Sequence, residues 1–100
     1  MPAKINRHGD CRLDPLATTL RSNLGITLQS VRASVHEAVV RGNEERADHL
    51  RADQLALGEL LGQVDGIMKR HHESGLSEQR GELELAEVRR GHEAIIREGF

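Results

Sequence analysis

The fold of this chain is decided by the stretch Asn43–His72, which reads NEERADHLRADQLALGELLGQVDGIMKRHH. Apolar residues recur there at alternating steps of four and three, with two polar residues completing the rhythm: Leu50, Gln54, Leu57, Leu61, Val64, Met68 and His71. This spacing predicts a long amphipathic helix with one apolar stripe of the coiled-coil kind. We interpret the remainder of the chain as what packs against this helix.

A second long helix is predicted immediately before it, over residues 14–41. Asp14 is a favoured N-cap, and Pro15 suits the first helical position because its missing N–H would be unpaired there. Gly42 suits the left-handed position that ends a helix, and Asn43 suits the N-cap of the next one. Helices of residues 14–41 and 44–72 that are joined this tightly must run antiparallel.

The two apolar stripes agree with this hairpin. If the turn is centred between residues 42 and 43, facing positions sum to about 85, and all of these pairs except one are apolar on both sides: Ala38–Ala47, Val35–Leu50, Val31–Gln54, Leu28–Leu57, Leu24–Leu61 and Ala17–Met68. Gly25 either ends a helix that Thr27 restarts or lies at a kink within one arm. The similar lengths of the two arms favour the kink.

A third helix is predicted over residues 77–98, with Ser77 as its N-cap. Its apolar stripe consists of Leu85, Val88, His92 and Ile95, and Gly81 and Gly91 weaken it. The predicted fold is therefore all-α: a long helical hairpin with a third helix on its side, as a three-helix bundle or within a dimeric helical bundle. Residues 1–13 are predicted to be a flexible, mildly basic tail, and residues 14–100 a single helical domain. We favour self-association, because the third helix looks too weak to cover the hairpin.

Composition excludes several classes of protein. The chain of 100 residues has one aromatic residue, which argues against an aromatic-cored sandwich or barrel, and its net charge of −2 gives no global case for nucleic acid. The single cysteine, Cys11, has no partner for an intramolecular disulfide. No run is long enough to span a membrane, and the N-terminus lacks an apolar signal core. We therefore expect a cytoplasmic protein, and the excess of arginine over lysine suggests a bacterial one.

The sequence contains no recognisable catalytic or metal motif. The six histidines show neither the Glu-x-x-His pattern of di-iron bundles nor the His-Glu-x-x-His of zincins. His49 lies one helical turn from both Glu45 and Asp53, and such a pair is more often a surface contact than a metal site. The similar segments that begin at His36 and His92 are interpreted as two helix C-termini in preference to phosphotransfer sites. We predict no enzyme activity and no cofactor.

We therefore predict a non-enzymatic helical interaction protein: an adaptor, assembly factor or small secretion-type chaperone that binds another protein, or a second copy of itself, through a helical surface. The alternatives are a small dimeric nucleic-acid-binding regulator, using the basic tail or the end of the third helix, and a metal-binding helical bundle. Gly58, Gly62 and Gly66 repeat every fourth residue, as where two helices approach closely; chance, or a local break at Asp65-Gly66, explains them equally well. The predicted partner-binding residues lie on this flank of the long helix: Leu55, Gly58, Leu60, Gly62, Gly66 and Ile67.

Overall fold

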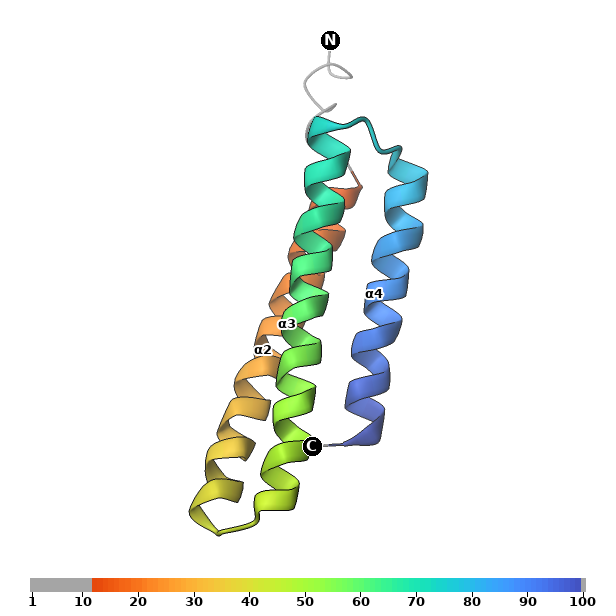
Figure 1. Cartoon of the computed structure of the whole chain (residues 1–100). Coiled ribbons are helices and arrows are strands. Elements are labelled where there is room, and N and C mark those ends of the chain that lie inside the picture. Colours follow the sequence, from red (N-terminus) through yellow and green to blue (C-terminus); the bar gives the residue numbers. More distant parts are fainter. Residues whose placement is uncertain (1–11, 100) are drawn as a thin grey trace.

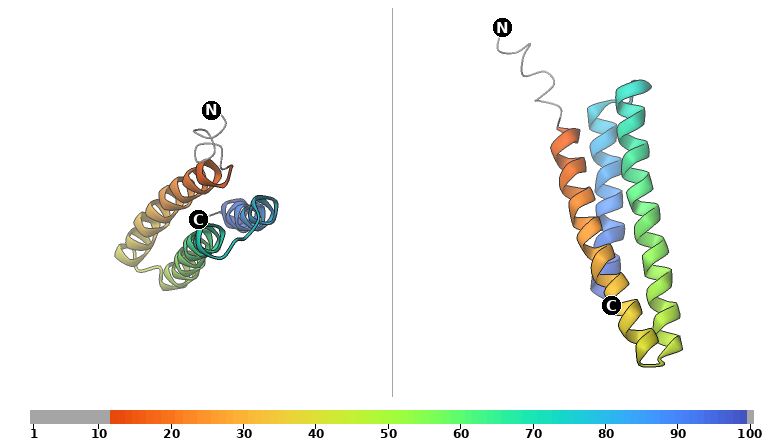
Figure 2. Two further views of the ribbon diagram at one scale, coloured as in Figure 1. Left: turned by 90° about the horizontal axis from the view of Figure 1, so that it is seen from above. Right: turned by 90° about the vertical axis from the view of Figure 1, so that its left-hand side faces the viewer.

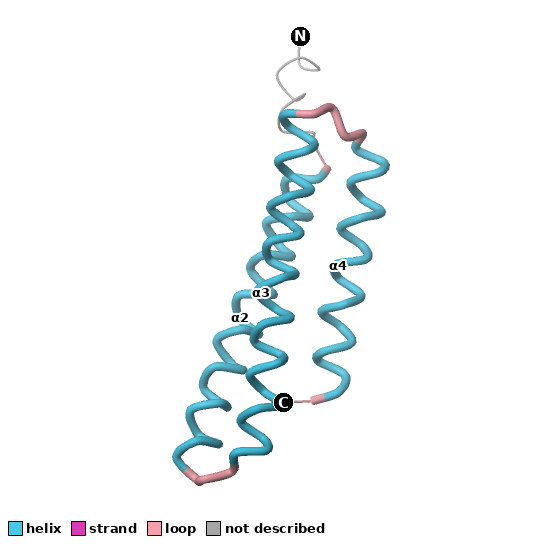
Figure 3. Tube along the Cα trace, viewed as in Figure 1, coloured by secondary structure: helices cyan, strands magenta, loops and turns pink. Residues whose placement is uncertain are grey.

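The predicted turn at Gly42-Asn43 is present and joins the two longest helices of a three-helix bundle. The computed structural model describes residues 12–99, and within that range it contains three helices and no strand: α2 (Leu13–Val40), α3 (Glu44–Glu73) and α4 (Glu78–Glu98) (Figure 1). Gly42 adopts a φ of +77°, and the Asn43 side chain accepts a hydrogen bond from the Arg46 N–H at 3.1 Å. Figure 3 shows the two short loops that separate the three helices. The predicted all-α hairpin with a third helix is confirmed.

The start of α2 differs from the prediction. The helix begins at Leu13, and Asp14 lies within its first turn, so the assignment of Asp14 as the N-cap is wrong. A carboxylate from another helix stands at this end instead, because Oε2 of Glu78 accepts a hydrogen bond from the Arg12 N–H at 3.1 Å. Leu13 is fully buried. Tertiary contacts therefore determine where α2 begins. The rest of the predicted tail, residues 1–11 with Cys11, lies outside the described residues, as does Phe100.

Both long helices run without interruption through their weakest points. α2 continues through Gly25, and α3 continues through Asp65-Gly66, so neither the restart at Thr27 nor the local break at Gly66 occurs. The Thr27 hydroxyl donates a hydrogen bond to the Asn23 carbonyl oxygen at 3.0 Å, within the same helix. Ser77 caps α4 as predicted by accepting a hydrogen bond from the Arg80 N–H at 3.1 Å. The predicted ends of the helices are thus correct to one residue.

The core lies along the predicted stripes of the hairpin and extends to α4. Its largest fully buried side chains come from α2 and α3: Leu13, Leu24, Val31, Leu50, Leu57 and Val64. Leu85 and Val88 of α4 complete the core, and Ile95 packs against it. Burial of apolar surface contributes about 25 cal/mol per Å² to stability. Contacts along this continuous seam are therefore the main contribution to the packing of the three helices.

α3 is the central helix, because it packs against α2 and α4 more extensively than those two pack against each other. Seen from above, the three helices stand at the corners of a triangle (Figure 2). The rod measures 61 × 22 × 20 Å. α4 has 21 residues against 28 in α2 and 30 in α3, so the tip of the hairpin extends beyond it (Figure 1).

Two glycines allow α4 to approach the hairpin. A Cβ atom placed on Gly81 would lie 2.5 Å from Cδ1 of Leu13, and one placed on Gly91 would lie 3.3 Å from Cδ2 of Leu60. Both glycines therefore contribute to packing, although in an isolated helix each would cost about 1 kcal/mol. None of the three helices is long and apolar enough to cross a membrane.

Candidate helix-binding groove

A groove of about 530 Å³ runs between α2 and α4, the two helices of the bundle that contact each other least. We call it the α2/α4 groove. α2 contributes the side chains of Leu16, Thr19, Leu20, Asn23, Ile26 and Thr27, and α4 contributes those of Glu82, Leu85, Ala86, Arg89, His92, Glu93 and Ile96. On each helix these residues recur at steps of three and four, so they form one face. The groove is consequently a straight track between two neighbouring helices.

Large apolar side chains are exposed along this track. Leu16 is 46% exposed, Ile26 is 60% exposed and Ile96 is 48% exposed. Leu20 and Leu85 lie in the same groove and belong to the core. The groove is therefore an outward continuation of the hydrophobic core that the three helices leave open to solvent.

A buried polar contact forms the floor of the α2/α4 groove. Nε2 of His92 lies 2.7 Å from Oγ1 of Thr27, and both residues are less than a tenth exposed. Because the Thr27 hydroxyl donates its only hydrogen to the Asn23 carbonyl, the imidazole must donate through Nε2–H. Burial lowers the pKa of His92, and the nearby carboxylate of Glu93 opposes this shift. The floor is thus neutral at physiological pH.

Charges line the α4 side of the groove. Arg89 pairs with Glu93 at 3.9 Å, and Glu82 pairs with Arg12 at 3.8 Å. Asn23 and Thr19 supply uncharged polar groups on the α2 side. An apolar centre with a polar rim is typical of a protein-binding surface.

The structure separates the residues that we predicted as one partner-binding face. Leu55 is 73% exposed and, with Gly58, lines a shallow depression between α2 and α3, while Gly62 and Gly66 are exposed beside open space. Ile67, in contrast, is only 3% exposed.

The placement of Ile67 on an outward flank is therefore wrong, and Leu60 is half-buried against Gly91 of α4. At about 100° per residue, Leu60 and Ile67 lie about 140° and 120° around the α3 axis from Leu55. They consequently face the third helix, and the glycine face does not. A role for the exposed members of this set in partner binding stays a prediction.

Sequence reasoning missed the α2/α4 groove. Leu16 and Ile26 are apolar residues of α2 and Ile96 is one of α4, but only the packing of α2 beside α4 brings the three together. The available signal was an apolar residue off the main stripe in each of two helices. Only those off-stripe residues that lie on the facing flanks of α2 and α4 line the groove between them.

Potential metal ligands converge elsewhere in the bundle. Over residues 12–99, the atoms of His49, Asp53 and Glu98 that are able to bind a metal lie within 4.8 Å of one another. His49 and Asp53 were recognised in the sequence as a pair, and the third residue comes from the end of α4. Glu45, the other predicted neighbour, is not part of this cluster.

The basic residues considered for nucleic acid are partly neutralised. Arg89 and Arg12 each pair with a glutamate, and the remaining basic residues of the tail lie outside the described residues. The nucleic-acid alternative stays a prediction.

No protein-family model, curated protein or solved structure matches this chain. The class that the fold defines is an elongated three-helix bundle with an open apolar groove between α2 and α4.

Proposed function

We propose that this chain is a non-enzymatic interaction protein that binds an amphipathic helix of another protein in the α2/α4 groove. The observation that carries the proposal is that three large, exposed apolar side chains, Leu16, Ile26 and Ile96, line one groove between two helices. Exposed apolar residues that gather in this way are typical of interaction sites. Binding of a helix in such a groove is a common mode of peptide recognition.

The dimensions of the groove suit a helix of three to four turns. Its lining runs from Leu16 to Thr27 on α2 and from Glu82 to Ile96 on α4. At 1.5 Å per residue these tracks are about 17 and 21 Å long. A helix lying along them would convert the three-helix bundle into a four-helix bundle, the commoner arrangement in which every helix buries its apolar face.

A partner helix from a different protein fits this groove better than a second copy of the bundle. A groove is filled by a convex helix that presents an apolar stripe. In residues 12–99 the other large exposed apolar side chains are Val39, Val40, Leu55 and Leu83, which come from three helices and form no stripe. The self-association that we predicted from the sequence would have to use another surface.

A panel of synthetic helical peptides tests the proposal. Each peptide of about 15 residues carries a leucine or isoleucine stripe at positions i, i+3, i+4 and i+7, and binding is measured by fluorescence anisotropy. We expect saturable 1:1 binding by the native chain and at least a tenfold loss in the Ile26→Asp variant. Ile26 is 60% exposed, so this substitution leaves the core intact.

Val40→Asp is the matched control, since Val40 is an apolar, β-branched residue on the same helix, 71% exposed and outside the groove. It should bind the peptides as the native chain does. The proposal is wrong if no peptide in the panel binds, or if both aspartate variants lose binding equally. Light scattering tests the alternative, that a second copy of the chain occupies the groove. If the native chain is a dimer and Ile26→Asp is a monomer, the groove is the dimer interface.

A further inference from the structure

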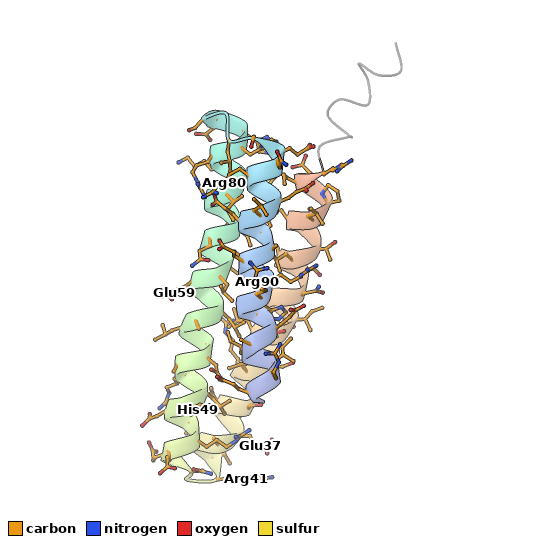
Figure 4. The ribbon with its side chains drawn as sticks, turned by 90° about the vertical axis from the view of Figure 1, so that its right-hand side faces the viewer. Glu37, Arg41, His49, Glu59, Arg80 and Arg90 are labelled. Carbon is orange, nitrogen blue, oxygen red and sulfur yellow. The ribbon has the colours of Figure 1, made fainter. Side chains whose placement is uncertain are left out.

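A cluster of three potential ligands joins α3 to the last turn of α4. His49 and Asp53 lie one turn apart on α3, and Glu98 is the last residue of α4. One ligand atom from each residue lies within 4.8 Å of the other two. Figure 4 shows His49 on α3 at the level where α4 ends. Residues far apart in the chain, at the start of α3 and at the end of α4, thus contribute to one site.

Asp53 is the unusual member of this cluster. It is only 8% exposed, and its Oδ2 atom accepts no hydrogen bond from residues 12–99. An ionised carboxylate without a partner in such a place is costly, because burial removes the water that would otherwise solvate it. Neither Asp53 nor Glu98 forms an ion pair with a lysine or arginine of the described chain. The site therefore carries uncompensated negative charge that a cation would neutralise.

We propose that His49, Asp53 and Glu98 bind a divalent transition-metal ion of the Zn²⁺ type. One imidazole and two carboxylates are a donor set that suits Zn²⁺ and its neighbours, whereas Ca²⁺ and Mg²⁺ prefer oxygen donors alone. The ion would connect the C-terminal end of α4 to the first third of α3. This site is independent of helix binding in the α2/α4 groove.

The geometry allows the three ligands to reach one ion. With bonds of about 2.0–2.2 Å to a tetrahedral Zn²⁺, ligand atoms lie about 3.3–3.5 Å apart, somewhat closer than the limit of 4.8 Å here. Asp53 is fixed by its burial, while His49 and Glu98 are exposed and free to rotate toward it. The C-terminal carbonyl groups of α4 add a partial negative charge at the same place, which favours a cation.

Zinc titration of the untagged full chain by calorimetry tests the site. We expect one Zn²⁺ per chain, and at least a tenfold weaker affinity in each of Asp53→Asn, Glu98→Gln and His49→Ala, since even the loss of a residue that only hydrogen-bonds a metal ligand costs about 10–100-fold. His36→Ala and Glu59→Gln, which alter exposed residues outside the cluster, should bind Zn²⁺ as the native chain does. Excess Mg²⁺ should not displace the bound Zn²⁺.

Thermal unfolding gives a second readout that does not depend on the titration. In the presence of a chelator, Asp53→Asn should unfold at the same temperature as the native chain or above it, because the substitution removes a buried unpaired charge. Added Zn²⁺ at about a hundredfold excess over the native Kd should raise the native Tm by about 10–20 °C and that of the variant by at most about half as much. Equal zinc affinity in native protein and Asp53→Asn, or no stoichiometric binding at all, would overturn the proposal.

Discussion

The Thr27 hydroxyl oxygen lies 2.7 Å from Nε2 of His92, and this contact joins α2 to α4 beneath the groove that the two helices line. Because Thr27 uses its hydrogen for the Asn23 carbonyl, the neutral imidazole is held with its proton on Nε2. Protonation of His92 would add a charge at Nδ1 of a ring that is only 6% exposed. The histidine therefore resists protonation, and its lowered pKa follows from its burial.

The lowered pKa of His92 predicts that the protein loses stability in mild acid. Between this pKa and the value of about 6.5 for an unfolded histidine, the unfolded chain binds more protons than the folded chain. The free energy of unfolding is then greatest above about pH 6.5 and falls as the pH drops through this interval. Thermal unfolding between neutral and mildly acidic pH should show this decrease, and His92→Gln should reduce it.

His36→Gln is the control for this pH dependence, since His36 is an exposed histidine on α2. It should retain the full decrease in Tm. An identical decrease in the native chain and in His92→Gln would show that another group is responsible for the loss of stability in acid.

A second prediction separates the glycines that pack from those that do not. Gly81→Ala would place a methyl group 2.5 Å from Cδ1 of the buried Leu13. Overpacking typically costs about 1–3 kcal/mol, which outweighs a gain in helix propensity of at most about 1 kcal/mol. We expect Gly81→Ala to lower the free energy of unfolding by about 1 kcal/mol. Urea unfolding monitored by circular dichroism would measure this change.

Gly62→Ala is the matched variant on α3. Nothing lies within 4 Å of a Cβ atom at Gly62, so only the gain in propensity applies. This variant should be more stable than the native chain by about 0.5–1 kcal/mol. A gain of the same size for Gly81→Ala would contradict the tight contact with Leu13.

The features of the fold that depend on local patterns could be predicted from the sequence. The turn at Gly42-Asn43 and the cap at Ser77 were predicted correctly because a cap is a local interaction within a few residues. The apolar stripes were correct because their period records which side of each helix is buried. The fold class and the helix boundaries other than the start of α2 therefore followed from local patterns.

Contacts between helices could not be derived in the same way. The sequence did not distinguish close approach of a helix at Gly58, Gly62 and Gly66 from chance or a local break, and the glycines that meet another helix are Gly81 and Gly91. The rotation of α4 about its own axis decides this, and no local pattern fixes that rotation. The same is true of Glu98, which only the packing of α4 brings beside Asp53.

A third prediction compares the effect on stability of removing a buried leucine and an exposed leucine from the same helix, α3. Leu57 is fully buried in the seam between α2 and α3, whereas Leu55, two residues earlier, is 73% exposed. Leu57→Ala should destabilise the protein by about 2–5 kcal/mol, because a buried leucine is replaced by a cavity. Leu55→Ala should change the free energy of unfolding by less than about 0.5 kcal/mol. Denaturant unfolding of both variants checks the placement of the seam, and a large loss for Leu55→Ala would contradict it.

The last prediction concerns the ion pairs of Glu84, which connect α4 to α3. Its two carboxylate oxygens accept hydrogen bonds from the guanidinium of Arg70 on α3, and Arg80 on α4 donates to it at 3.3 Å. The hydrogen bonds from Arg70, and then those from Arg80, lower the pKa of Glu84. This carboxylate therefore contributes stability above its ordinary pKa of about 4.3, and the contribution is lost as the pH falls through the lowered value.

Glu84→Gln should consequently have a lower Tm than the native chain at neutral pH, and the two Tm values should converge in acid as the native carboxylate becomes protonated. Raising the salt concentration at neutral pH should narrow the difference in Tm, because the side chains of Arg70 and Arg80 are half to two-thirds exposed and salt screens their charges. Glu59→Gln, at an exposed glutamate that forms no ion pair with residues 12–99, should match the native chain throughout. A difference between native protein and Glu84→Gln that persisted unchanged in acid would mean that the side chain acts through packing, and that its charge does not hold α4 against α3.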